Sequence, residues 1–289
     1  MSVRPARLSV ALLVLAGVLW GTGGLAGAML QSAAGLSPVA VAAYRLLVGG
    51  LLATVVVAGQ LRYLRGRAAL SRLLVAGGLL AQFQAAYQVA VAQIAVSLAT
   101  LITIGCVPVF VVVISGVRER RVLLAVGTAV LGLALLSGGA AGADGWQVVS
   151  GVVMSLVAGA GFAALTLVSA RPVPGQHVVT SAGLLLGGLF LLPLAGFDGM
   201  SVPLAGDVLA LIGFLGLVPT ALAYGSYFLG LRHAHPTAAA LATMLEPLTA
   251  TVLAVALHGE RLTAAGVVGA LLIAGALALY YLAPGTQEG

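Results

Sequence analysis

Two groups of polar side chains lie inside long apolar runs, and each group falls on one face of a helix. The groups are Gln84, Tyr87 and Gln88 in one run and Thr220, Tyr224 and Tyr227 in a later one. Spacings of three and four residues bring side chains to the same helical face. Polar groups are costly in hydrocarbon, so such a face either lines a water-filled cavity or hydrogen-bonds to neighbouring helices. We favour a cavity for both groups and keep the second interpretation open.

Two charged residues and one tryptophan in the apolar runs are further candidates for the same site. Glu246 directly precedes Pro247, which loosens a helix because proline lacks a backbone N–H. The Glu246 carboxyl group either couples transport to a proton gradient or holds the fold together by a hydrogen bond. Arg45 either attracts a substrate carboxylate or serves the structure, by reaching the interface or capping a helix. Trp20 lies near the middle of its run and either forms an apolar wall for a substrate or fills the core.

The composition requires these residues to be positioned by membrane-spanning helices. Of 289 residues, 61% are hydrophobic and 7% are charged, which leaves too little polar surface for an ordinary soluble enzyme. Continuous apolar runs also exclude a β-barrel, whose strands alternate polar and apolar residues. We therefore predict an all-α integral membrane protein with ten transmembrane helices. The runs are 8–30, 38–58, 73–92, 94–115, 122–140, 147–169, 178–197, 208–231, 236–257 and 263–282.

The arginines predict the orientation of these helices. With the N-terminus in the cytoplasm, 11 of the 13 basic residues face inside, as the positive-inside rule requires. Asp144, Asp198, Asp207, Glu260 and Arg261 then fall in the outer loops. The topology is thus N-in and C-in. The arginines lie in short clusters between apolar runs, so we expect no nucleic-acid partner despite the net charge of +6.

The chain repeats itself after about 140 residues. The matching pairs are Tyr87 with Tyr227, Pro108 with Pro247, and Glu119 with Glu260. Each half contains five predicted spans, so the second half enters the membrane in the opposite direction. Inverted repeats of this kind are typical of secondary transporters. We place the two halves at residues 1–143 and 144–289.

Several short motifs resemble those of a known family. Leu245-Glu246-Pro247-Leu248 and His258-Gly259-Glu260-Arg261 resemble the second-repeat signature of the drug/metabolite transporter superfamily, EamA type. Leu19-Trp20-Gly21-Thr22, Ser37-Pro38 and Tyr44-Arg45 resemble its first-repeat signature. The chain is also similar to the amino-acid exporters of the YddG kind within that superfamily. The resemblance implies a basket of helices around a central cavity, outward movement of the substrate, and peripheral fifth and tenth spans.

These observations predict a secondary transporter of the cell inner membrane that exports aromatic or other neutral amino acids. We expect Trp20, Gln84, Tyr87, Gln88, Thr220, Tyr224 and Tyr227 to bind the substrate, with Glu246 and Arg45 as coupling or scaffold groups. An exporter of lipophilic drugs or other metabolites is the alternative within transport. An intramembrane enzyme and a membrane scaffold are alternatives of other classes. We expect the bilayer and a small-molecule substrate as partners, no cofactor, no metal, no catalytic residue, and a monomer as the working state.

Overall fold

The helices of the protein follow the apolar runs of its sequence. The computed structural model describes residues 3–94, 96–136, 145–171, 173–258 and 262–281, and within these residues it contains helices and no strand. Nine helical stretches in these ranges are long and apolar enough to cross a membrane. An apolar segment in lipid must satisfy its own backbone hydrogen bonds, which favours the helix. The all-α membrane architecture expected from the composition is therefore confirmed.

The helices of the first half are α1 (Val3–Ala34), α2 (Pro38–Val56), the short 3₁₀ segment η1 (Ala58–Arg65), α3 (Arg67–Gln93), α4 (Val96–Ser115) and α5 (Arg120–Leu136). Those of the second half are α6 (Gly145–Ser169), α7 (Gln176–Asp198), α8 (Gly206–Gly216), the π-helical segment η2 (Leu217–Leu222), α9 (Ala223–Leu231), α10 (Pro236–Ala242), α11 (Leu245–His258) and α12 (Ala264–Tyr281). The described part of α5 has 17 residues, slightly fewer than a full crossing needs. Asp144, Glu260 and Arg261 lie outside the described residues.

A proline changes the helical register in the middle of the α8–η2–α9 span. Pro219 has no N–H to donate to the carbonyl group of Leu215, four residues earlier. The Thr220 hydroxyl group replaces that donor, with 2.8 Å between Thr220 Oγ1 and Leu215 O. Further along, the Ala223 N–H donates to the carbonyl group of Val218, five residues back, in the π pattern. π-helical turns of this type occur frequently at functional sites.

A second proline interrupts the next span, between α10 and α11. Pro247 cannot donate to the carbonyl group of Thr243, which instead accepts the Glu246 N–H at 3.0 Å. The helix therefore breaks at Thr243 and Met244, and Glu246 lies in the first turn of α11. The loosening expected at Pro247 is confirmed, whereas Pro108 lies inside the continuous helix α4.

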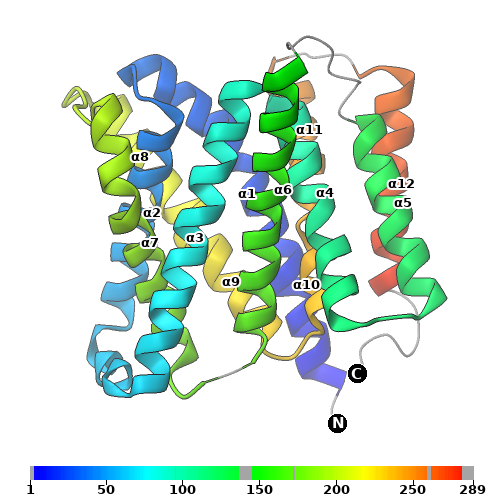
Figure 1. The fold of residues 1–289 in the computed structure, drawn as a ribbon, viewed down its shortest axis with the longest axis horizontal. Helices are drawn as coiled ribbons and strands as arrows, with labels where there is room; N and C mark the ends of the chain where they lie inside the picture. The colour runs from blue at the N-terminus through cyan, green and yellow to red at the C-terminus, as the bar shows by residue number, and fades with distance from the viewer. Residues whose placement is uncertain (1–2, 95, 137–144, 172, 259–261, 282–289) are drawn as a thin grey trace.

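The helices pack in pairs around two central ones, α1 and α6 (Figure 1). Helix α1 packs on α9 and α11, while α6 packs on α3 and α4. Helix α2 packs on α7, and α5 packs on α12 at one edge of the molecule (Figure 1). The buried core therefore lies where α1, α3, α6 and α9 meet, and large apolar side chains such as Leu51, Val113 and Leu271 are exposed on the outer faces.

The arginine-bearing helix ends gather at one end of the molecule. The segments η1, the start of α3, the start of α5 and the end of α9 all lie at the end of the molecule where α1 begins and α12 ends (Figure 1). They carry Arg62, Arg65, Arg72, Arg120 and Arg232. We refer to this as the arginine-rich end.

Candidate functional site

A central cavity of about 60 Å³ lies between helices of both halves of the chain. Helices α1 to α4 line it on one side, and α6, α9, the α10–α11 break and α11 line it on the other. The lining residues are Trp20, Arg45, Phe83, Gln84, Tyr87, Thr103, Ile104, Phe162, Tyr224, Thr243 and Glu246. Almost every span thus contributes at least one side chain to the same small space.

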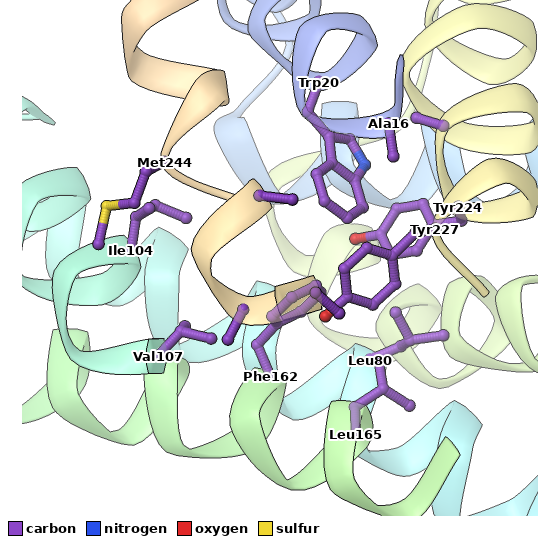
Figure 2. Close-up of a cluster of buried hydrophobic side chains, with 14 of the residues drawn as sticks. Ala16, Trp20, Leu80, Ile104, Val107, Phe162, Leu165, Tyr224, Tyr227 and Met244 are labelled. Atoms are coloured by element: carbon purple, nitrogen blue, oxygen red, sulfur yellow. The ribbon is translucent and has the colours of Figure 1, made fainter. Parts of the chain in front are cut away.

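Aromatic rings form a connected wall beside this cavity. The Trp20 ring lies 5.7 Å from the ring of Phe162 and 5.1 Å from that of Tyr224, centroid to centroid, in edge-to-face arrangements. Phe83 continues the wall, 5.1 Å from Phe162. Figure 2 shows the rings of Trp20, Phe162 and Tyr224 turned toward one another. Offset and edge-on aromatic contacts of this kind stabilise a rigid apolar surface.

Three polar side chains on the cavity surface have no hydrogen-bond partner among the described residues. They are the amide group of Gln84, the hydroxyl group of Tyr224 and the carboxyl group of Glu246. The Nε1–H of Trp20 is also buried without an acceptor. Buried polar groups are nearly always paired in proteins, so several unpaired ones around one cavity indicate a place where water or a ligand supplies the missing partners.

Arg45 extends from α2 across to the π-helical segment. Its Nη2 donates to the carbonyl group of Pro219 at 3.2 Å, and its Nε donates to Thr220 Oγ1 at 3.3 Å. The same side chain lines the cavity. Among the residues that the structure describes, no hydrogen bond or ion pair joins Arg45 to Glu246. The cavity therefore holds a guanidinium group and a carboxyl group that do not pair with each other.

Two further polar residues of the lining are already occupied by protein partners. The Tyr87 hydroxyl group lies 2.6 Å from Thr100 Oγ1, and Thr103 Oγ1 donates to the carbonyl group of Ser155 at 3.2 Å. These contacts join α3 to α4 and α4 to α6. The side chains of Tyr87 and Thr103 therefore form part of the cavity wall but offer no free hydrogen-bonding group to a ligand.

The structure brings six of the nine candidate residues into the cavity lining and places three beside it. Trp20, Gln84, Tyr87, Tyr224, Arg45 and Glu246 line the cavity. Of the other three, Gln88 is half-buried on α3, Thr220 bonds to Arg45, and Tyr227 packs fully buried behind the aromatic wall. The lining residues that sequence reasoning did not identify are Phe83, Thr103, Ile104, Phe162 and Thr243. Among them, only Phe83 and Phe162 carried a sequence signal, as aromatic residues in mid-span.

Tyr224 and Tyr227 offer a matched pair of substitutions. Tyr224→Phe removes a hydroxyl group that has no protein partner in the described chain, so we expect transport to fall about threefold to tenfold with little change in stability. Tyr227→Phe removes the 2.7 Å contact with Thr166 Oγ1, so we expect stability to fall by about 1 kcal/mol with transport largely retained. Thermal unfolding and uptake by each purified variant test these two expectations. The same response from both variants would contradict the assignment.

The chain is similar in sequence and in fold to known transporters and to a solved structure. Residues 149–282 match the sequence profile of the EamA-like transporter family. An uncharacterized transporter of Bacillus subtilis (strain 168), YwfM, is 30% identical over 95% of this chain and 94% of its own length. An uncharacterized transporter of Archaeoglobus fulgidus is 30% identical over 67% of this chain and 70% of its own length. One solved crystal structure superposes with a TM-score of 0.80 at 20% identity, covering 97% of this chain and 99% of that chain, which shows a shared fold.

Proposed function

This chain belongs to the EamA-like transporter family, and from that premise we propose that it exports neutral or aromatic amino acids across the inner membrane. Family membership makes it a multi-pass membrane transporter of small molecules rather than an enzyme. The observation that carries the proposed substrate class is the central cavity, where the Arg45 guanidinium group and the unpaired Glu246 carboxyl group share a lining with aromatic rings.

The charges of the cavity suit the backbone of an amino acid. A zwitterion presents a carboxylate and an ammonium group a short distance apart. The Arg45 guanidinium group donates hydrogen bonds to the first, and the Glu246 carboxyl group accepts them from the second. The rings of Trp20, Phe83 and Phe162 then face the amino-acid side chain. A mostly apolar pocket with a few placed polar groups is the usual form of a small-molecule site.

The cavity is small in this conformation. Its volume of about 60 Å³ holds a few water molecules. In the proposed mechanism the substrate enters when the two halves rock apart and leaves when they rock the other way. Alternating access around a fixed midplane site is the usual mechanism of inverted-repeat transporters.

Helix packing supports the division into inverted halves at residues 1–143 and 144–289. In chain order, α8–η2–α9 is the eighth span, α10–α11 is the ninth and α12 is the tenth. Exchanging each span with its equivalent in the other half, five places away, turns the pair α3–α6 into α9–α1 and the pair α4–α6 into α11–α1. The pairs α2–α7 and α5–α12 map onto themselves. All of these pairs are in contact, as a two-fold relation between the halves requires. On this basis α5 is the fifth of ten spans, and the arginine-rich end faces the cytoplasm.

Glu246 has two candidate roles within this mechanism. As a coupling group, it takes up a proton on one side of the membrane and releases it on the other. As a scaffold and binding group, it serves facilitated transport with no dependence on the gradient. Its position in the first turn of α11, directly at the helix break, is compatible with both.

Uptake into proteoliposomes containing only the purified protein tests the proposed function. We expect saturable uptake of labelled phenylalanine or another neutral amino acid, which an excess of unlabelled amino acid competes away. An imposed pH gradient that accelerates uptake by the unmodified chain but not by Glu246→Gln identifies Glu246 as the coupling group, and a rate that the gradient leaves unchanged identifies it as scaffold. The double variant Tyr87→Ala/Tyr224→Ala, checked for folding, is the matched control and should be inactive.

The same experiment contains the result that would overturn the substrate class. If no amino acid is taken up while a lipophilic cation or another apolar metabolite is, the aromatic wall serves drug or metabolite export instead. If the double variant Tyr87→Ala/Tyr224→Ala transports amino acids as well as the unmodified chain does, the substrate does not bind in this cavity.

A further inference from the structure

A second hollow lies on the outer face of the molecule, where it is lined by Gly225 of α9, the neighbour of the cavity-lining Tyr224. It consists of two adjoining spaces of about 230 Å³ and 160 Å³ between α2, α7 and the α8–η2–α9 span. The two spaces share Val57, Thr180, Ser181, Gly225 and Phe228 in their linings, so they form one groove. We call it the α2–α7–α9 groove. None of the candidate substrate-binding residues lines it.

The groove is polar at one end and apolar over the rest of its length. At the arginine-rich end it is lined by Gln176, His177 and Arg232. Toward the middle of the membrane it is lined by Leu52, Leu217 and Leu222, all partly exposed on the outer surface. From Phe228 to Leu217 the apolar part covers about 17 Å along the span, at about 1.5 Å per residue. Half of the hydrocarbon core of a bilayer is about 15 Å thick.

The polar end contains a buried side chain with no partner. Gln176 is 5% exposed, and both its amide oxygen and its amide nitrogen lack a hydrogen bond. An unsatisfied buried amide of this kind costs free energy, so a ligand that bonds to it is favoured. The Arg232 guanidinium group is exposed nearby and also lacks a hydrogen bond or ion pair within the described residues. No carboxylate lines the groove.

We propose that the α2–α7–α9 groove binds an anionic phospholipid, with its phosphate at Gln176 and Arg232 and one acyl chain in the apolar part. The guanidinium group and the Gln176 amide N–H both donate to phosphate oxygens. The position at the end of the hydrocarbon region is where basic pockets between transmembrane helices bind lipid headgroups. The groove is lined by α2 of the first half and by α7 and α9 of the second half. A lipid bound there would therefore contact all three helices and stabilise their packing. The inference does not depend on which substrate the central cavity carries.

Three substitutions separate the parts of this site. Arg232→Gln removes the charge at an exposed position. Gln176→Leu removes the unpaired amide group, so we expect the stability without added lipid to be equal or higher while lipid binding falls. Gly225→Leu fills the groove, because a Cβ atom built there meets nothing within 4 Å, and leucine favours the helix more than glycine does. Arg120→Gln is the control, because it removes one charge at the same end of the molecule but on α5 (Figure 1).

The test is lipid binding to the full chain in detergent, measured by native mass spectrometry and by the lipid-induced rise in Tm. We expect palmitoyl-oleoyl phosphatidylglycerol to bind and to raise Tm, and phosphatidylcholine of the same chains to do neither to the same extent. Arg232→Gln should weaken phosphatidylglycerol binding about tenfold, and Gly225→Leu and Gln176→Leu should reduce the rise in Tm. Arg120→Gln should behave like the unmodified chain.

Three outcomes would overturn the proposal. Equal effects of phosphatidylcholine and phosphatidylglycerol would show that no anionic headgroup is recognised. Unchanged binding in both Arg232→Gln and Gly225→Leu would place the lipid elsewhere. Equal losses in Arg232→Gln and Arg120→Gln would mean that phosphatidylglycerol is attracted only by the overall positive charge of this end. If Gly225→Leu does not fold, Arg232→Gln at an exposed position still decides the matter.

Discussion

Arg45→Gln is expected to weaken the binding of phenylalanine by about tenfold to a hundredfold and to leave the binding of phenethylamine nearly unchanged. Phenethylamine has the same ring and ammonium group but lacks the carboxylate. A hydrogen bond to a charged group contributes about 1.5–3 kcal/mol, and every 1.4 kcal/mol is a factor of ten in affinity. The loss is therefore confined to the ligand that carries the carboxylate. Calorimetric titration of the purified chain with both ligands measures it.

A matched substitution separates this binding role of Arg45 from its structural role. Thr220 bonds to Arg45 Nε at 3.3 Å but does not line the cavity. Thr220→Val therefore loosens Arg45 while it keeps the charge and the contact with the Pro219 carbonyl group. We expect it to weaken phenylalanine binding far less than Arg45→Gln does, because the guanidinium charge remains. If Arg45→Gln affects both ligands equally, Arg45 only holds α2 against the π-helical segment and does not bind the carboxylate.

Glu246→Gln tests the group that is expected to bind the ammonium group of the substrate. It should weaken phenylalanine binding but not the binding of phenylpropionate, which lacks the ammonium group. In the Arg45→Gln and Glu246→Gln variants, opposite ligand preferences would define the direction in which the substrate lies in the cavity. The double variant measures how strongly the two charges are coupled, because Arg45 and Glu246 line the same cavity with no hydrogen bond or ion pair between them in the described residues.

The polar face of α3 could be predicted from sequence because an uninterrupted α-helix preserves its spacing. Gln84 and Tyr87 both reach the cavity, as the three-residue interval predicts. The corresponding face of the later span could not be predicted in the same way. Thr220 lies in the π-helical segment, where the extra residue per turn rotates it relative to Tyr224. It therefore bonds to Arg45 instead of facing the cavity.

The remaining part of the site depends on how helices cross, which spacing along one helix does not determine. Phe162 and Thr103 reach the cavity because α6 packs on both α3 and α4. In sequence, Phe162 is marked only as a mid-span aromatic residue, and Thr103 carries no signal. The break before Pro247 was predictable from the missing N–H, and it exposes Thr243 to the cavity. By contrast, Pro108 gives the same local signal and leaves α4 unbroken, so the tertiary packing decides which proline opens a helix.

Gly21→Leu is expected to cause a large loss of folded protein. A Cβ atom at Gly21 would lie 2.5 Å from Thr249 Cβ and 2.7 Å from the carbonyl oxygen of Glu246. Both distances are too short, so α1 and α11 must move apart. Overpacking of this kind costs about 1–3 kcal/mol or more. Small residues allow transmembrane helices to approach closely, and Gly21 does so at this contact.

Gly24→Leu on the same helix is the matched control, because a Cβ atom there meets nothing within 4 Å. We expect Gly24→Leu to elute and unfold like the unmodified chain in size-exclusion chromatography and thermal unfolding, and Gly21→Leu to show a clearly lower Tm. Equal behaviour of the two variants would contradict the close approach of α1 and α11. The proposed function also gives this contact a role in transport, since Gly21 packs directly on the backbone of Glu246. A separation of α1 from α11 would move Glu246 away from Trp20, so these two groups would no longer line the same cavity.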